Sequence, residues 1–461
     1  MKQNCKKWHM LKSTAVFATL FIVTGVFTAC GKSDKEDIAR DLVGTVTSDS
    51  AMEDDAVQGE IPESLSYTVG AVKVEAEVYS EGYGQVPTYK LKKKDKNDEW
   101  IMSYAEKLFD DGEYINVKPY DFCSMEELEA EKQFWEERLM ALDESSNGYS
   151  HVQSEIRYIE YAMEHFSESN DVKYPEGQLV FTKNTSDYVG DFTYDESYER
   201  AQLRGEVDGN VWLLNYDYTV AEYDGSVTIY EPVLFGSCVE KMDYISGSYG
   251  MDLGIYENKC DRAEAESEAE KLLDRLGFNN MECIKITELH PDQVTCCDGY
   301  SIIYGPSLNG IKMFSCVIVG TVVGETIAVQ PYVNILVNSE GAYSFCIMED
   351  YDAEETLSEN SQMLSFQQID DIAHAEFEKI MNERPDMSYD ITKVKFEYLC
   401  VTYDGIDYAM IPAWTYYMET YYMGGRGTAS VYPVLIVNAL DGTVISSEPV
   451  NFNWEYCFIM Q

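Results

Sequence analysis

Basic residues are scarce in this chain of 461 residues. It carries 34 lysines and arginines against 82 aspartates and glutamates, a formal net charge of −48 at pH 7. Proteins bind nucleic acids through Lys and Arg contacts to phosphates, so this balance argues strongly against a nucleic-acid partner. It also argues against lying flat on an anionic lipid surface. The acidity itself indicates solubility and at most weak binding of cations.

Catalytic and metal-binding signatures are scarce as well. The chain has no P-loop and no GxGxxG pattern, and Ser246–Gly250 departs from GxSxG because Ser replaces the first Gly. Acidic runs such as Asp110–Glu113 lack the spacing of an EF-hand, which favours a solvated surface. The histidines beyond the first thirty residues are scattered, and none lies in an HExxH pattern: His151, His165, His290 and His374. We therefore predict no enzyme, no cofactor and no metal site.

The start of the chain has the pattern of a secretory leader. Four lysines precede an apolar run, Thr14–Phe27, and small residues then lead to Cys30. The apolar run is shorter than the roughly 20 residues that cross a bilayer comfortably. An uncleaved membrane anchor is the alternative, and the positive charge before the run sends the rest of the chain outward in either case.

The end of this leader resembles the lipobox of bacterial lipoproteins. Phe27-Thr-Ala-Cys30-Gly31 carries the resemblance, with Phe27 where the family usually has Leu. The resemblance implies that residues 1–29 are removed and that Cys30 receives a diacylglycerol. The protein is then expected at the cell membrane, held by its N-terminal lipid and facing the extracytoplasmic side.

Cysteines are too widely spaced to indicate a disulfide framework or a metal site. Besides Cys5 and Cys30, ten of the 12 cysteines remain, and adjacent Cys296 and Cys297 form neither a CxxC motif nor a zinc knuckle. Most lie in apolar, strand-like surroundings, where a free cysteine behaves as a small hydrophobic residue. We expect them to be mostly reduced core residues.

Residues 30–61 are polar and acidic, and we predict a disordered tether. Residues 62–255 then form a first α+β domain. Its strands are expected over 66–79 and 86–91, and its two helices over 124–143 and 152–166 form a hairpin that opens with a capping box at Ser124 and Glu127. Asp208-Gly209 predicts a tight β-hairpin turn.

The second half contains a weak tandem repeat, over 256–360 and 361–461. Each copy has a capped helix, at Asp261 and at Ser365 with Gln368, followed by strands. Each copy also closes on an apolar strand and an Asn–Gly turn, Asn338 to Gly341 and Asn438 to Gly442. The predicted fold class is α+β, with antiparallel sheets packed against helices and a tandem of helix-plus-sheet repeats in the C-terminal half.

This half resembles PepSY-type domains, in which a helix is followed by strands closing on such a hairpin. The last stretch is also similar to extracytoplasmic YycH/YycI-type regulators of a cell-wall sensor kinase, on Val394–Tyr398, Ile411–Trp414 and Val437–Gly442. The family has no catalytic residues to transfer. The resemblance implies a non-catalytic protein that binds or regulates a cell-envelope partner, such as a sensor kinase or a protease.

Tyrosine is abundant, with 36 copies, and several gather near one tryptophan. Such rings can stack on sugars or grip peptides. The candidate ligand contacts are Trp414, Tyr416, Tyr417, Tyr421 and Tyr422. They support an alternative function, a ligand-binding lipoprotein that captures a glycan or a peptide, while tyrosine also simply suits half-exposed strands. An envelope hydrolase is the third and least supported hypothesis.

Overall fold

The computed structural model describes most of the chain after the expected tether. The described residues are 60–84, 86–118, 120, 123–144, 148–166, 182–189, 193–223, 226–229, 233–241, 260–289, 299–314, 327, 330–348, 351–402, 408–421 and 429–446. For 182–189, 193–200, 217–223, 226–229, 419–421 and 429–431 the description is limited to the backbone. The leader, Cys30 and the tether lie outside these ranges.

Two sheets and five α-helices make up the described part of the chain, which confirms the α+β class. The eight-stranded sheet has the order β1-β2-β16-β17-β18-β19, with β3 and β15 attached through β17. Its strands are β1 (Ser64–Val69), β2 (Val72–Tyr79), β3 (Val86–Lys93), β15 (Tyr351–Ser361), β16 (Tyr389–Thr402), β17 (Tyr408–Tyr421), β18 (Ala429–Asn438) and β19 (Val444–Ser446).

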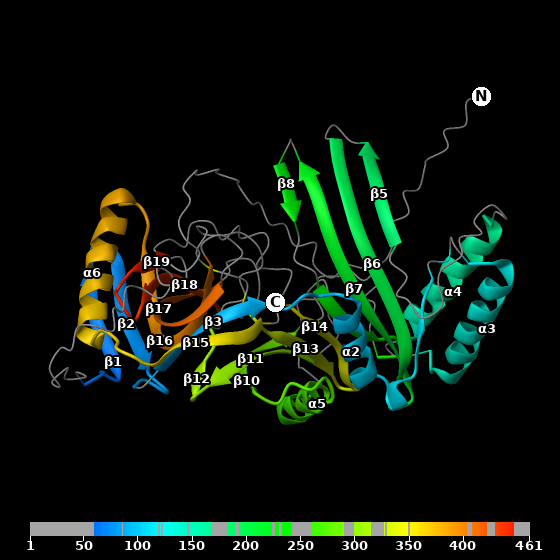
Figure 1. Ribbon diagram of the computed structural model, residues 1–461, viewed down its shortest axis with the longest axis horizontal. Coiled ribbons are helices and arrows are strands. Elements are labelled where there is room, and N and C mark those ends of the chain that lie inside the picture. The colour runs from blue at the N-terminus through cyan, green and yellow to red at the C-terminus, as the bar shows by residue number, and fades with distance from the viewer. Residues whose placement is uncertain are drawn as a thin grey trace.

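The eleven-stranded sheet has the order β10-β11-β13-β14-β9-β7-β6-β4, with β12, β5 and β8 attached at its sides. Its strands are β4 (Tyr114–Asn116), β5 (Thr182–Val189), β6 (Thr193–Val207), β7 (Asn210–Tyr223), β8 (Ser226–Ile229), β9 (Val233–Cys238), β10 (Met281–Leu289), β11 (Gly299–Leu308), β12 (Ile311–Lys312), β13 (Val333–Asn338) and β14 (Gly341–Ile347). The helices lie at its ends and along it: α2 (Asp98–Leu108), α3 (Met125–Ala141), α4 (Tyr149–Glu164) and α5 (Arg262–Arg275), with α6 (Phe366–Glu383) on the other sheet (Figure 1).

The tandem repeat is present in the structure. Helix α5 is followed by the meander β10, β11, β13 and β14, and α6 is followed by the meander β16 to β19. Both predicted caps form: the Asp261 carboxylate accepts from two backbone amides of α5, and Ser365 and Gln368 make a capping box on α6. Each helix buries its apolar face on the sheet of its own repeat.

The two repeats also share their closing turn. The Oδ1 atom of Asn338 accepts from the backbone amide two residues on at 2.8 Å, and Oδ1 of Asn438 does the same at 2.9 Å. The glycines that end the turns, Gly341 and Gly442, have φ angles of 108° and 78°, which a side chain would disfavour. The asparagine side chain therefore bonds in the same way in both copies, although the turn of the second copy is one residue longer.

Strand pairing crosses the expected domain boundaries. The stretch 66–79, predicted as one strand, is a hairpin whose turn is at Gly70, with a φ of 59°. Strand β2 pairs parallel to β16, and β3 pairs with β15 and β17, so the first strands join the sheet of the second repeat. Strand β9 likewise extends the sheet of the first repeat through β14. The alternating pattern that marks a strand carries no information about its partner.

The helical hairpin lies at the end of the molecule opposite α6 (Figure 1). Its capping box at Ser124 and Glu127 forms as predicted. Its inner face forms an apolar cluster with the neighbouring sheet, built on Leu128, Trp135, Val152, Ile156, Ile159, Val211, Leu213 and Val239. The cluster fixes the hairpin beside β7 and the end of β9, and this placement creates the wall of the site described below.

Within the described ranges, no helix is long and apolar enough to cross a membrane. Six cysteines fall in these ranges, and each is in its thiol form: Cys123, Cys238, Cys260, Cys283, Cys346 and Cys400. Burial raises the pKa of the Cys238 and Cys346 thiols to about 12, so both are neutral at physiological pH. Cys296 and Cys297 lie outside the described residues.

Candidate functional site

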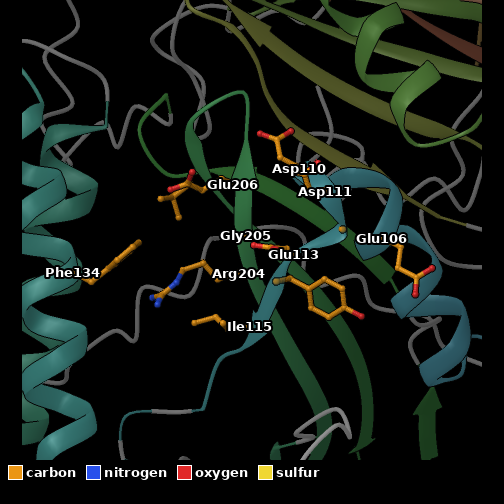
Figure 2. A pocket seen from close by; sticks show the side chains of 12 residues that line it. Glu106, Asp110, Asp111, Glu113, Ile115, Phe134, Arg204, Gly205 and Glu206 are labelled. Atoms are coloured by element: carbon orange, nitrogen blue, oxygen red, sulfur yellow. The ribbon is translucent and has the colours of Figure 1, made fainter.

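A groove of about 780 Å³ opens between α3 and the segment that joins α2 to β4. We call it the acidic groove, because five of the twelve residues that line it carry carboxylates and one is an arginine. These residues are Glu106, Asp110, Asp111, Gly112, Glu113, Tyr114, Ile115, Phe134, Arg204, Gly205, Glu206 and Val211. Figure 2 shows Phe134 on the α3 side of the groove, Glu106 on the α2 side, and Arg204 and Gly205 between them.

The acidic wall is a tight turn. Helix α2 ends at Leu108, and the 3₁₀ turn η1 (Asp110–Gly112) sends the chain into β4. Asp111 and Gly112 have φ angles of 54° and 68°, a region that Asp and Gly enter more readily than other residues. The reversal leaves Asp111 and Glu113 exposed at the mouth of the groove.

Gly205 allows this turn to lie directly on β6. A Cβ atom at this position would lie 2.4 Å from Cδ1 of Phe109 and 2.8 Å from the carbonyl oxygen of Glu113. Both distances are shorter than real Cβ contacts, so a side chain at 205 would push the acidic turn away from the sheet. The shape of the groove therefore depends on a glycine near the end of the long strand β6.

The opposite wall carries a neutralised cation. Arg204 on β6 makes a bidentate ion pair with Glu131 on α3, with Nη2 3.0 Å from Oε2, and its guanidinium lies 4.2 Å from the centre of the Phe134 ring. The side chain of Arg204 is 9% exposed and that of Glu131 is 17% exposed. Glu131 balances Arg204 from outside the lining. Of the five carboxylates in the lining, Asp110 and Glu206 have arginine partners of their own, so the negative field of the groove comes mainly from the other three.

A second arginine joins α3 to the sheet at the rim. Arg138 pairs with Glu206, and its Nη1 lies 3.5 Å from Oε1 of Glu240. The other oxygen of Glu240 accepts from the backbone amide of Val211 at 2.7 Å. Burial raises the pKa of the Glu240 carboxyl, although this hydrogen bond and Arg138 act in the opposite direction.

Behind α3, polar side chains are buried inside the hairpin. The hydroxyl of Tyr120 donates to Oε2 of Glu155 at 3.0 Å, and Nε2 of the buried His151 lies 4.0 Å from Oε1 of Glu155. Burial lowers the pKa of His151 to about 4 and raises the pKa of Glu155. His151 is therefore neutral at pH 7.

The acidic groove combines negative charge with exposed apolar surface. Ile115 on β4 is 51% exposed, and Phe134 is partly buried. Such a surface can hold a cationic group by its charge and the hydrocarbon stem of the same side chain by apolar contact. The described residues contain no cluster of His, Cys, Asp and Glu able to hold a metal ion.

The aromatic residues predicted to contact a ligand lie elsewhere. Trp414, Tyr416 and Tyr417 are 0%, 0% and 1% exposed, so they are core residues of the eight-stranded sheet. The Tyr416 hydroxyl donates to Asp370 on α6 at 3.2 Å, and the Tyr417 hydroxyl donates to Glu397 at 2.5 Å. In this conformation the three rings offer no surface to a ligand. The side chain of Tyr421 and all of Tyr422 lie outside the described residues, as does Cys30.

The burial of these rings follows from their strand having two covered faces. Helix α6 covers one face, where Trp414 packs 4.7 Å from the Phe366 ring. Phe314 from the first repeat covers the other face, beside Tyr417. A strand covered on both sides reads as a nearly continuous apolar run, and β17 has that pattern.

Comparison with known proteins gives two distant similarities. No family model matches the chain, and no curated protein matches it. An uncharacterized protein from Eubacterium rectale, known from a crystal structure, is similar over 90% of this chain and 99% of its own, with 13% identity and a TM-score of 0.41. The Bacillus megaterium YpeB C-terminal domain is similar over 58% of this chain and 88% of its own, with 10% identity and a TM-score of 0.24. Neither similarity is close enough to assign a family or a function to this chain.

Proposed function

We propose that this chain is a non-catalytic protein, anchored outside the cell membrane by a lipid on Cys30, that binds a basic segment of another cell-envelope protein in the acidic groove. A sensor kinase or a protease is the expected kind of partner. The supporting observation is that two exposed carboxylates, Asp111 and Glu113, line the same groove as the exposed Ile115 and the ring of Phe134.

Several weak attractions would act together on a basic segment in this groove. One exposed ion pair contributes roughly 0.2–1 kcal/mol, which is too little for recognition. In a concave site the carboxylates add, and a Lys or Arg stem that packs on Ile115 removes apolar area from water. The net charge of −48 also attracts a basic partner over a distance and speeds the encounter.

Replacing two exposed carboxylates of the groove should weaken binding of a basic peptide. We expect the variant Asp111→Asn, Glu113→Gln to bind a labelled peptide of alternating Lys and Leu about tenfold more weakly, since two ion pairs of this kind amount to about 1.4 kcal/mol. Fluorescence anisotropy with the mature protein measures the dissociation constant. Binding by the native chain should itself weaken as salt is raised.

The matched control removes the same charge from a distant place. Glu355 and Glu359 are exposed on β15, in the other sheet, and their replacement by Gln should leave the affinity unchanged. An equal loss of affinity in both double variants would show that the peptide responds to net charge alone, and the groove would then have no special role.

Removal of the lipid attachment point tests the anchor. The Cys30→Ala variant should lose its lipid and move from the membrane fraction to the soluble fraction. The apolar run of the leader is too short to span a bilayer comfortably, so it should not retain the protein in the membrane without the lipid. Cell fractionation with metabolic labelling by a fatty acid measures both changes. A Cys30→Ala protein that stays in the membrane fraction would show that the apolar run is an uncleaved anchor.

A further inference from the structure

An arginine of the first repeat reaches the acidic wall of the groove. Arg275 lies in the last turn of α5, and its Nη1 donates to the carbonyl oxygen of Leu108 at 2.8 Å and to Oδ1 of Asp110 at 2.9 Å. Its Nη2 lies 3.4 Å from Oδ1 of Asp208. One guanidinium therefore contacts the end of α2, the acidic turn and the β6–β7 turn.

The two turns that Arg275 joins are also bonded to each other. The backbone amide of Asp208 donates to Oδ2 of Asp110 at 2.8 Å, so both oxygens of Asp110 have partners. Asp208 itself has a φ of 51°, and Gly209 has a φ of 79°, as a tight turn of this kind requires. Asp110 is thus held in place, whereas Asp111 and Glu113 are left facing the groove.

We propose that Arg275 is a positioning residue of the acidic groove, through which helix α5 of the first repeat holds the turn 110–113 in the arrangement that receives a basic ligand. This inference rests on the proposed function of the groove. It assigns two parts to the acidic wall: Asp110 serves as the attachment point, and Asp111 with Glu113 bind the ligand. It also couples the first repeat to the binding site.

The ion pair between Arg275 and Asp110 lies near the surface, so its direct contribution to the stability of the fold is small. The side chains of Arg275 and Asp110 are 27% and 38% exposed, and pairs of that exposure typically contribute less than about 1 kcal/mol. The geometry is specific nevertheless, because the planar guanidinium satisfies three acceptors at once, including a carbonyl at the end of α2. Loss of Arg275 should therefore affect the order of the turn more than the stability of the fold.

The test compares Arg275→Ala with Arg262→Ala. Arg262 lies on the same helix and pairs along the helix surface with Glu266 at 2.8 Å, so it is the matched control. We expect Arg275→Ala to speed amide hydrogen exchange in the segment 109–115 about tenfold, since the turn opens locally without global unfolding. It should also weaken binding of the Lys–Leu peptide about fivefold, while Arg262→Ala changes neither quantity.

The variant Arg275→Lys separates position from charge. Lysine keeps the positive charge but lacks the planar fork, so it should restore little of the exchange protection. If the native chain binds the peptide and Arg275→Ala binds it equally well, the groove keeps its function and the positioning role is wrong. If the native chain does not bind the peptide, the function of the groove fails and the inference fails with it.

Discussion

Replacing Arg204 by methionine should lower the free energy of unfolding by about 3 kcal/mol. The range for breaking a buried ion pair is about 3–5 kcal/mol, because the remaining charge stays buried without its partner. We expect the lower end, since the side chain of Glu131 is 17% exposed and water can reach part of it. Glu131 would keep one other contact, the hydrogen bond from Nε1 of Trp135 at 2.9 Å.

Removing both charges should restore most of this stability. In the double variant Arg204→Met, Glu131→Leu no buried charge remains, and a buried pair replaced by apolar residues is often neutral or stabilising. The methionine can still pack on the Phe134 ring that the guanidinium covered. A coupling energy between the two sites of about 2 kcal/mol or more is therefore the expected result of the double-mutant cycle.

Urea unfolding of the four proteins provides the measurement, with the slope m compared to show that the unfolded states are alike. Lys132→Met is the control on the same helix, because Lys132 pairs with Glu136 and Glu160, which are 50% and 49% exposed. It should cost less than about 1 kcal/mol. An Arg204→Met protein as stable as this control would mean that the Arg204–Glu131 pair is solvated and does not fasten α3 to the sheet.

Acidification should destabilise the chain through His151. The ordinary pKa of a histidine, 6.5, applies to the unfolded chain, whereas burial lowers the pKa in the folded chain to about 4. Between these values the unfolded state binds a proton that the folded state does not, so stability is full above pH 6.5 and falls as the pH decreases towards 4. The loss amounts to roughly 3 kcal/mol, since one pKa unit corresponds to about 1.4 kcal/mol.

Glu155, which lies beside His151, and its partner Tyr120 can modify the size of this loss. Tyr120 is neutral throughout the range, because burial raises its pKa well above 10. Glu155 has a raised pKa, so its protonation in the folded state begins at a higher pH and favours folding as the pH falls. Glu155 therefore offsets part of the effect of His151 at the acidic end of the range.

The measurement is the difference in unfolding free energy between the native chain and His151→Leu, at pH 7 and at pH 4.5. Relative to the variant, the native chain should lose about 2–3 kcal/mol over this interval, because leucine takes up no proton. His374→Leu, which removes a half-exposed imidazole from α6, controls for loss of a histidine in general. Parallel pH curves for the native chain and His151→Leu would show that His151 is protonated without opening the hairpin.

Local signals predicted local structure well. Ser124 and Ser365 start helices where their capping boxes indicate, and the Asp208-Gly209 turn joins β6 to β7. The sequence shows only part of the groove. Asp110–Glu113 form an acidic run, but this run matches no known motif and therefore predicts no site. Phe134 and Arg204, which complete the groove, come from distant positions and carried no pattern of their own. The sequence patterns also could not show that β2 pairs with β16, since any alternating strand fits many partners.

The first strands of the chain pair with strands of the second repeat, and this pairing affects the order in which the chain can fold. Tyr67 bonds to Asp370 across 303 positions, and Tyr398 bonds to the carbonyl of Pro87 across 311 positions. At a synthesis rate of roughly 5–20 residues per second, β1, β2 and β3 are made on the order of tens of seconds before the late residues that they contact. Contacts of such long separation also form slowly once the chain is complete. We therefore expect the eight-stranded sheet to be the last part of the protein to close, and until then its first strands would present unpaired edges to any other chain nearby.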